Sequence, residues 1–259
     1  MSKPWTKIVP ILITLLLLNN WEFFPSTIRL VDGCENPAPN KKIALSFDDQ
    51  THIPRWNESL PHFQQYNVNA TFYIDRQNQL SEYDYATLHH FVEMGHEIGL
   101  HTLEHKSLTI HLQNGGNEQK WFEEQVITSM QIMEQRGFEI NSFAYPFGER
   151  NTKTDDLVHT VIPVIRTTQW ISIGIEPYYT YCTDKGVFGA MSISDQKNNL
   201  DEVLSFIQHK EAGTLLLYGH NINGSGDSIS LHNLVSIFQE AENNDWEFIT
   251  MKDLIKSEN

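Results

Sequence analysis

The chain has 259 residues, of which 40% are hydrophobic and 11% aromatic, so it can bury a substantial core and is not disordered throughout. Its 18 basic and 33 acidic side chains give a net charge of −15, and no run of lysine or arginine forms a local basic patch. This balance argues against nucleic acid or an anionic membrane surface as partner, because both require clustered positive charge. The 2 cysteines are too few for a disulfide-rich scaffold or a four-thiolate zinc site.

The N-terminus has the features of an export signal. Lys3 and Lys7 precede the apolar run Ile8 to Leu18, which as a helix would span roughly 16 Å of a bilayer core that is about 30 Å thick. We therefore predict a signal peptide over residues 1–20, with an uncleaved N-terminal membrane anchor as the alternative. The protein is then exported to the periplasm, the cell envelope or the medium.

A proline-interrupted linker is predicted over 21–40 and one folded domain over 41–259. In an oxidising compartment Cys34 and Cys182 could form a disulfide, and two unpaired cysteines are the equal alternative.

Strand-like and helix-like segments alternate from residue 41 onward. Apolar runs predict strands at 43–47, 70–74, 97–101, 142–145, 164–168, 214–218 and 247–250. Helical spacing and glycine stops predict helices over 55–66, 82–94, 119–136, 152–160, 199–210 and 228–243, with a short one from 251. Residues 170–196 are expected to be irregular. This alternation predicts an α/β fold, a distorted (β/α)7-type barrel, with a doubly wound open sheet as the alternative.

Three groups of polar residues directly follow predicted strands, which in a β/α barrel places them on the rim where active sites lie. The first is the adjacent pair Asp48 and Asp49. Two close carboxylates are stable together only if they share a cation or if one of them holds a proton. The alternative is a helix-capping acid beside a solvated neighbour.

The second group is His101 and His105, whose spacing allows both to reach one ion if the chain turns after the strand. Neutral imidazoles suit zinc and related divalent ions, and Asp49 would complete a set of two histidines and one carboxylate. Surface histidines are the alternative. The third is His220, which follows an apolar strand and has a side chain suited to general acid catalysis. A hydrogen-bonded structural histidine is the alternative for it.

These groups, in chain order, resemble those of a known enzyme family. The matching blocks are Phe47-Asp48-Asp49, the run from Gly95 to His105, Tyr145-Pro146-Phe147-Gly148, and Leu217-Tyr218-Gly219-His220. Residues 41–256 resemble the polysaccharide deacetylases of the NodB-homology class, carbohydrate esterase family 4. The resemblance implies a distorted β/α barrel, one divalent metal ion (zinc first, with cobalt or manganese also suited) and removal of N- or O-acetyl groups from a glycan partner.

The resemblance also implies roles for individual residues. Asp48 corresponds to the catalytic base and His220 to the catalytic acid. The backbone N–H of Phe147 falls where the family has an oxyanion donor. The metal ligands implied are Asp49, His101 and His105.

The chain departs from the family pattern near the acid pair. Gln50 replaces a usual glycine, and Ala144 stands where an arginine usually steadies the base. Arg166, near the end of a predicted strand, is our candidate for supplying that positive charge beside Asp48.

The Asp-Trp block that usually orients the catalytic histidine is not recognisable. Asp184 and Asp195 are both candidates for that role, and the sequence does not choose between them. Trp170 is a candidate for stacking on a sugar ring, with a packed rim aromatic as the equal alternative.

Three other functions stay open. An enzyme of the same fold could act on a formamide or a cyclic imide, although the export signal argues against substrates usually handled inside cells. A catalytically weak, metal-containing glycan-binding protein would fit the missing arginine, but it would need neither Asp48 nor His220. A barrel without metal would leave Asp49 and the histidines bonded to one another.

Overall fold

The structure is a computed structural model that describes residues 41–168, 178–179 and 185–255. The predicted signal and linker segments, over 1–20 and 21–40, lie outside the described residues, as do Cys34, Cys182, Asp184 and Trp170. In the part of the chain that is described, no helix is both long and apolar enough to cross a bilayer.

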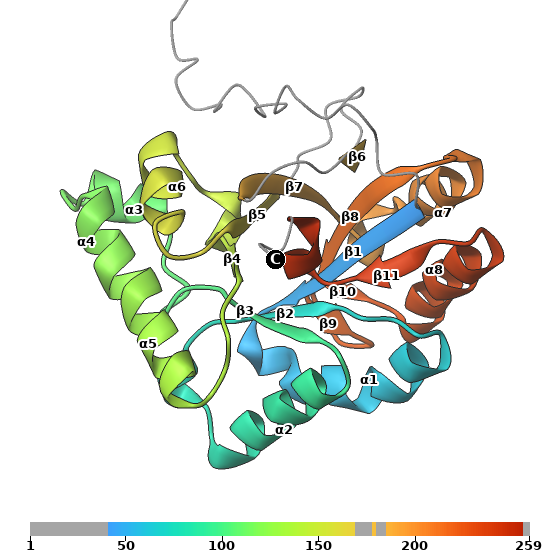
Figure 1. The fold of residues 1–259 in the computed structure, drawn as a ribbon, viewed down its shortest axis with the longest axis horizontal. Helices are drawn as coiled ribbons and strands as arrows, with labels where there is room; N and C mark the ends of the chain where they lie inside the picture. The colour runs from blue at the N-terminus through green and yellow to red at the C-terminus, as the bar shows by residue number, and fades with distance from the viewer. Residues whose placement is uncertain (1–40, 169–177, 180–184, 256–259) are drawn as a thin grey trace, which may run out of the picture.

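A closed ring of seven parallel strands forms the centre of the fold (Figure 1). In ring order they are β1 (Lys41–Asp48), β2 (Thr71–Ile74), β3 (Glu97–Leu100), β4 (Ser142–Ala144), β5 (Val164–Thr168), β7 (Gly186–Ser192) and β8 (Gly213–Gly219). The ring closes because β8 also pairs with β1, from Lys41 opposite Gly213 to Phe47 opposite Gly219. The predicted α/β barrel is therefore confirmed, and the open-sheet alternative is wrong.

One barrel strand differs from the prediction. The stretch 170–196 was expected to be irregular, but it contains β7, which pairs with β5 on one side and β8 on the other. Its sequence GVFGAMS has two glycines and a single large aromatic side chain, so it lacks the apolar run that marked the other strands. The predicted last strand does form, as β11 (Glu247–Ile249), but it pairs with the first half of β1 outside the ring.

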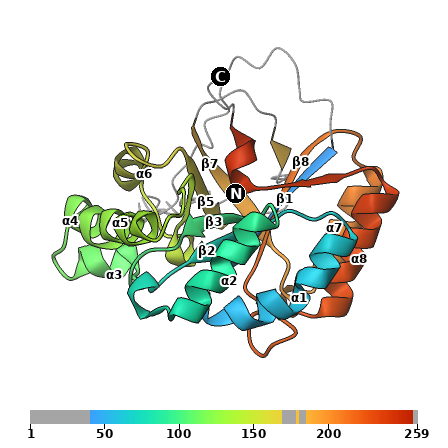
Figure 2. The ribbon, with the colours of Figure 1, turned by 60° about the horizontal axis from the view of Figure 1, so that its bottom comes forward.

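Helices cover the outer face of the barrel (Figures 1 and 2). They are α1 (Ile53–Gln65), α2 (Glu82–Glu93), α3 (Leu108–Gln113), α4 (Glu118–Phe122), α5 (Thr128–Gln135), α6 (Thr152–Val158), α7 (Leu200–His209) and α8 (Leu231–Asn243). Most agree with the predicted spans to within a few residues. The predicted helix over 119–136 is interrupted by a π-turn, η3 (Glu123–Ile127), between α4 and α5.

The predicted helix over 228–243 starts later than expected. Its first residues form β10 (Ser228–Ile229), which pairs with β9 (Asn221–Ile222). Ser230 then caps α8, because its hydroxyl accepts a hydrogen bond from the N–H of Asn233. A two-residue strand, β6 (Tyr178–Tyr179), pairs antiparallel with β8 outside the ring. Five shorter 3-10 turns complete the described chain: η1 (Gln50–His52), η2 (Gln77–Gln79), η4 (Pro146–Gly148), η5 (Asp195–Lys197) and η6 (Met251–Leu254).

The two faces of β1 explain how the barrel is filled. Ile43, Leu45 and Phe47 belong to the core between the strands and the helices, whereas Ala44 lies among the residues that fill the interior. Met251 and Leu254 of η6 join that interior cluster, and η6 stands at the centre of the ring in Figure 1. One end of the barrel is thus plugged, since the N–H of Met251 donates to Thr71 at the start of β2. The other end carries the carboxyl ends of the strands.

Candidate active site

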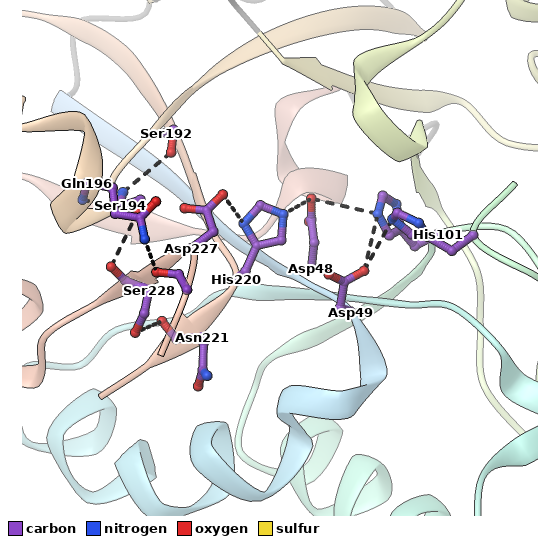
Figure 3. Close-up of polar contacts among 12 residues, drawn as sticks. Asp48, Asp49, His101, Ser192, Ser194, Gln196, His220, Asn221, Asp227 and Ser228 are labelled. Atoms are coloured by element: carbon purple, nitrogen blue, oxygen red, sulfur yellow. Dashed lines mark hydrogen bonds and ion pairs between the residues drawn. The ribbon is translucent and has the colours of Figure 1, made fainter. Parts of the chain in front are cut away.

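Asp48 is at the centre of a polar cluster at the carboxyl end of β1 (Figure 3). Its side chain is buried and forms an ion pair with the guanidinium of Arg166. Its Oδ2 also lies 4.0 Å from Nε2 of His101 and 4.0 Å from Nε2 of His220. Residues from β1, β5, the loop after β3 and the end of β8 therefore meet at one carboxylate.

The register between two strands explains how Arg166 reaches Asp48. Arg166 of β5 is the register partner of Ala144 of β4, and both are fully buried. The small alanine leaves room for the guanidinium, which lies 5.3 Å from the ring centroid of Tyr73 and 4.7 Å from that of Tyr218. The family resemblance led us to expect an arginine at position 144, where this chain has alanine. Arg166, on the neighbouring strand, supplies the positive charge beside Asp48 instead.

The charges around Asp48 keep it ionised. Burial alone would raise the pKa of Asp48, but the positive charge of Arg166, with contributions from His101 and His220, outweighs burial and lowers that pKa below its ordinary value. The side chain is therefore a carboxylate at neutral pH, held in one place and able to accept a proton.

Asp49, His101 and His105 form a second, adjoining cluster. Asp49 Oδ1 lies 3.8 Å from Nε2 of His101 and 3.4 Å from Nε2 of His105, and one ligand atom from each residue lies within 4.8 Å of the others. The chain turns sharply at Asp49, whose φ is 76°. The buried carboxylate of Asp75 holds this turn, because it accepts a hydrogen bond of 2.9 Å from the N–H of Gln50.

The donor atoms of this cluster fit a metal cation. Nδ1 of His101 lies 2.8 Å from the carbonyl oxygen of Ala144. A carbonyl only accepts, so Nδ1 carries the hydrogen and Nε2 presents a lone pair. Nε2 faces Asp49 Oδ1, which is buried and makes no hydrogen bond. Two acceptors that face each other repel unless a cation lies between them.

The acid–base properties of the cluster agree with a cation site. Burial lowers the pKa of His101 to about 3, so the ring is neutral and able to ligate. Burial, and then the negative charge of Asp48, raise the pKa of Asp49. The separations of 3.4 and 3.8 Å to the histidines also argue against the alternative in which these groups hydrogen-bond to one another. Two imidazole nitrogens and one carboxylate oxygen suit zinc and related divalent ions.

Both clusters line one open cleft of about 710 Å³. Phe147 of η4 forms part of the wall of this cleft; its backbone is left-handed, with φ 60°, and the residue is 59% exposed. The ring centroid of Phe147 lies 4.7 Å from that of His105. The remaining lining residues are His52, Tyr145, Thr168, Met191, Ser192, Lys197, Asn199, Glu202, Tyr218, Ser225 and Asp227.

Asp227 faces His220, and the sequence did not reveal it. Oδ2 of Asp227 lies 3.1 Å from Nδ1 of His220, an ion-pair contact on the side of the ring away from Asp48 (Figure 3). Of the two acids considered from the sequence, Asp195 accepts hydrogen bonds from Ser230 and Asn233 at the start of α8 instead. Asp184 lies outside the described residues.

Contacts to its main chain and to its ring hold His220 in place. The indole N–H of Trp56 donates a hydrogen bond of 2.7 Å to the carbonyl oxygen of His220. Burial by itself would lower the pKa of His220, but the contact with Asp227 and the charge of Asp48 raise it above its ordinary value. The contact with His220 in turn lowers the pKa of Asp227 to about 2. The ring therefore holds a proton more readily than an isolated histidine does.

The comparison with known protein families agrees with this geometry. A family profile described as polysaccharide deacetylase matches residues 35–161. Over these residues the chain matches the polysaccharide deacetylase family. The matched region contains Asp48, Asp49, His101, His105 and Phe147, whereas Arg166, His220 and Asp227 come from the part of the barrel that follows it.

Curated deacetylases are similar to part of this chain. The peptidoglycan-N-acetylglucosamine deacetylase PgdA of Listeria monocytogenes is 24% identical over 151 residues, which is 58% of this chain and 30% of that protein. The chain thus spans about a third of the length of the curated relatives that it matches.

Solved structures share the fold at low identity. The peptidoglycan deacetylase PdaC of Bacillus subtilis superposes with a TM-score of 0.57 at 18% identity, covering 83% of this chain and 90% of PdaC. A family 4 carbohydrate esterase pseudoenzyme of Bacillus anthracis gives a TM-score of 0.56 at 13% identity, covering 85% of this chain and 69% of that one. The same barrel therefore occurs in both an enzyme and a pseudoenzyme, and function has to be argued from the site.

Proposed function

We propose that the protein is a metal-dependent hydrolase that removes N- or O-acetyl groups from a polysaccharide or oligosaccharide of the cell envelope or the surrounding medium. The observation that carries this proposal is the position of Asp48. Its carboxylate lies 4.0 Å from Nε2 of His101 on one side and 4.0 Å from Nε2 of His220 on the other. A proton acceptor, a proton donor and a three-ligand cation site thus border a single cleft.

Asp49, His101 and His105 would hold the metal ion, with zinc as the first candidate and cobalt or manganese also suited. When bound there, a divalent ion would polarise the acetyl carbonyl and make a water molecule easier to deprotonate. The fit rests on the unpaired Asp49 Oδ1 and on the lone pair of His101 Nε2 beside it.

The chain's own residues divide the proton transfers between them. Asp48 accepts the proton of the attacking water, and Arg166 keeps it ionised and oriented for that task. His220, paired with Asp227, donates a proton to the departing nitrogen or oxygen of the sugar. An amine is a poor leaving group without that proton, so the raised pKa of His220 matters most for N-acetyl substrates.

The backbone N–H of Phe147 is our candidate donor to the oxyanion that develops on the acetyl carbonyl oxygen. The left-handed conformation of Phe147 supports this assignment, because a non-glycine residue held at φ 60° beside a cleft is strained. The resembled family usually has tyrosine at this position, and because the proposed role belongs to the main chain, phenylalanine would serve equally.

An acetylated cell-wall glycan is the substrate class that the proposal favours. The predicted signal segment over 1–20 would bring the enzyme to the envelope, either released or anchored by that segment. The relatives PgdA and PdaC are both named as peptidoglycan deacetylases. The experiment has to distinguish this function from two alternatives: an amidase of the same fold that acts on a non-acetyl amide, and a catalytically weak glycan-binding protein.

The test is acetate release by the purified full chain from acetylated glycans, measured with added zinc, cobalt or manganese and again after treatment with EDTA. Asp48→Asn and Asp49→Ala should each lower the rate by at least about a hundredfold. Asp201→Asn, an exposed acid on α7, is the matched control and should behave as wild type.

Each outcome has a distinct meaning. Metal-dependent release that both variants lose supports the proposal and names the substrate. Metal binding without release from any glycan would point to a non-acetyl amide substrate or to a binding role. No metal bound by the wild type would overturn the proposal.

A further inference from the structure

The helix beside the loop that carries His101 and His105 contains a π-turn, η3 (Glu123–Ile127), at which the N–H of Thr128 reaches the carbonyl of Glu123. A π-turn fits one more residue into a helical turn, and so it leaves a main-chain carbonyl free for a donor from outside the helix. Here the carbonyl of Gln125 accepts a hydrogen bond of 3.0 Å from the N–H of Leu103. The interruption of the helix thus faces the loop between the two histidines.

The side chain of Gln125 makes a second connection to the same loop. It is 1% exposed, and its Oε1 accepts a hydrogen bond of 3.0 Å from the N–H of Glu104. Its Nε2 donates to the carboxylate of Glu104 at 2.9 Å. The main-chain N–H groups of Leu103 and Glu104, which lie between His101 and His105, therefore both donate to Gln125.

The loop has a conformation that needs such support. Thr102 has φ 69° and His105 has φ 53°, both in the left-handed region that β-branched and bulky residues avoid. These two residues set the direction in which each imidazole leaves the main chain. Trp121 holds the far end of the loop, because its indole N–H donates to the carbonyl of Lys106.

We propose that Gln125 is a positioning residue for the cation site. Through Leu103 and Glu104 it fixes the strained turn so that the Nε2 atoms of His101 and His105 converge on Asp49. This inference rests on the proposed function in that it needs the three-ligand site to bind a metal ion. It adds a residue from outside the ligand set, whose side chain hydrogen-bonds to Glu104 in the loop between the two histidines.

The test measures the affinity of the full chain for zinc, by competition with a chromophoric chelator, alongside thermal unfolding in EDTA. Gln125→Met keeps the unbranched shape and the main-chain carbonyl but removes the acceptor of the Glu104 N–H. We expect zinc binding to weaken by about tenfold, the low end for groups outside the ligand set. Gln131→Met, at an exposed position on α5, should keep the wild-type affinity.

A charge-swapped pair separates positioning from general stability. Gln125→Glu keeps an acceptor for the Glu104 N–H but sets two carboxylates against each other, and so it should also weaken zinc binding. Adding Glu104→Gln restores a donor and an acceptor in exchanged places, and it should return the affinity to within about threefold of wild type. This pair serves even if Gln125→Met does not fold.

Two results would overturn the inference. In one, every Gln125 variant that folds binds zinc as tightly as wild type. In the other, the variants lose stability in EDTA while the zinc affinity of the folded protein stays unchanged, which is what a purely structural residue would show. Either of these results would leave zinc binding by the wild type, and so the proposed function, intact. If the wild type itself bound no zinc, the proposed function would fail as well. The two failures are therefore distinguishable.

Discussion

Replacing Arg166 with methionine should destabilise the fold, because it leaves the Asp48 carboxylate buried without its compensating charge. The two side chains are 0% and 4% exposed, and their ion pair joins β5 to β1 within the barrel. Methionine keeps an unbranched apolar stem, so the change removes a charge and its donors more than it removes packed volume.

The magnitude follows from the burial of both partners. Removing one member of a buried ion pair costs about 3 to 5 kcal/mol, whereas an exposed pair contributes about 0 to 1 kcal/mol. His220 lies 4.0 Å from Asp48 and can replace part of the lost positive charge by taking up a proton. We therefore expect the lower end of the range, about 3 kcal/mol at pH 7.

The assay is unfolding in guanidinium chloride with EDTA present, so that loss of metal does not contribute. Without Arg166, burial should raise the pKa of Asp48 above its value in the unfolded chain. The stability deficit of the variant is then complete at neutral pH and shrinks as the pH falls and the carboxyl becomes protonated. A control, Arg55→Met, removes an exposed ion pair with Glu58 and should cost less than about 1 kcal/mol.

Combining Arg166→Met with Asp48→Asn removes both charges, and it should recover most of the lost stability. A single-variant cost below about 1 kcal/mol would refute the reasoning, as would a double variant no more stable than Arg166→Met alone.

Two further predictions concern histidines. Burial lowers the pKa of His96 to about 4 in the folded protein. Between about pH 6.5 and pH 4 the unfolded chain therefore binds one more proton than the folded chain does. The free energy of unfolding should be highest above this range and should fall by about 3 kcal/mol as the pH is lowered through it. Urea unfolding between pH 7.5 and 4.5 should give a shallower slope for His96→Asn, and equal slopes would contradict the assignment. Asp227→Asn should shift the basic limb of the kcat profile to lower pH, since its contact helps to keep His220 protonated, and kcat at pH 8 should fall by about tenfold. A pH–rate profile with an unchanged basic limb would remove Asp227 from the mechanism.

Much of the barrel could be predicted because most of its strands are short apolar runs that end in polar residues. That pattern located β1, β2, β3, β5 and β8, and it placed Asp48 and His220 at strand ends where they do meet. It failed for β7, whose pairing on both sides stabilises a segment that has little strand propensity of its own.

Outside the motifs shared with the resembled family, the site was predictable only where strand geometry controls a side chain. Arg166 could be anticipated because it lies on a strand that leads to the rim. Asp227 could not, because it comes from the glycine- and serine-rich loop after β9, whose path depends on contacts such as that between Gln196 and the carbonyl of Gly226. The role proposed for Gln125 depends on a π-turn that no periodicity in the sequence announces.

The register pair of Ala144 and Arg166 bears on how members of this family are compared. Their side chains come from adjacent strands at the same height in the barrel, so a guanidinium from either position can approach the same carboxylate. Loss of an arginine at one position could then be compensated by an arginine at the other during evolution. The double variant Ala144→Arg with Arg166→Ala would place the guanidinium on β4 instead of β5. A motif search that inspects only position 144 would miss the positive charge that Arg166 supplies to Asp48 from the next strand.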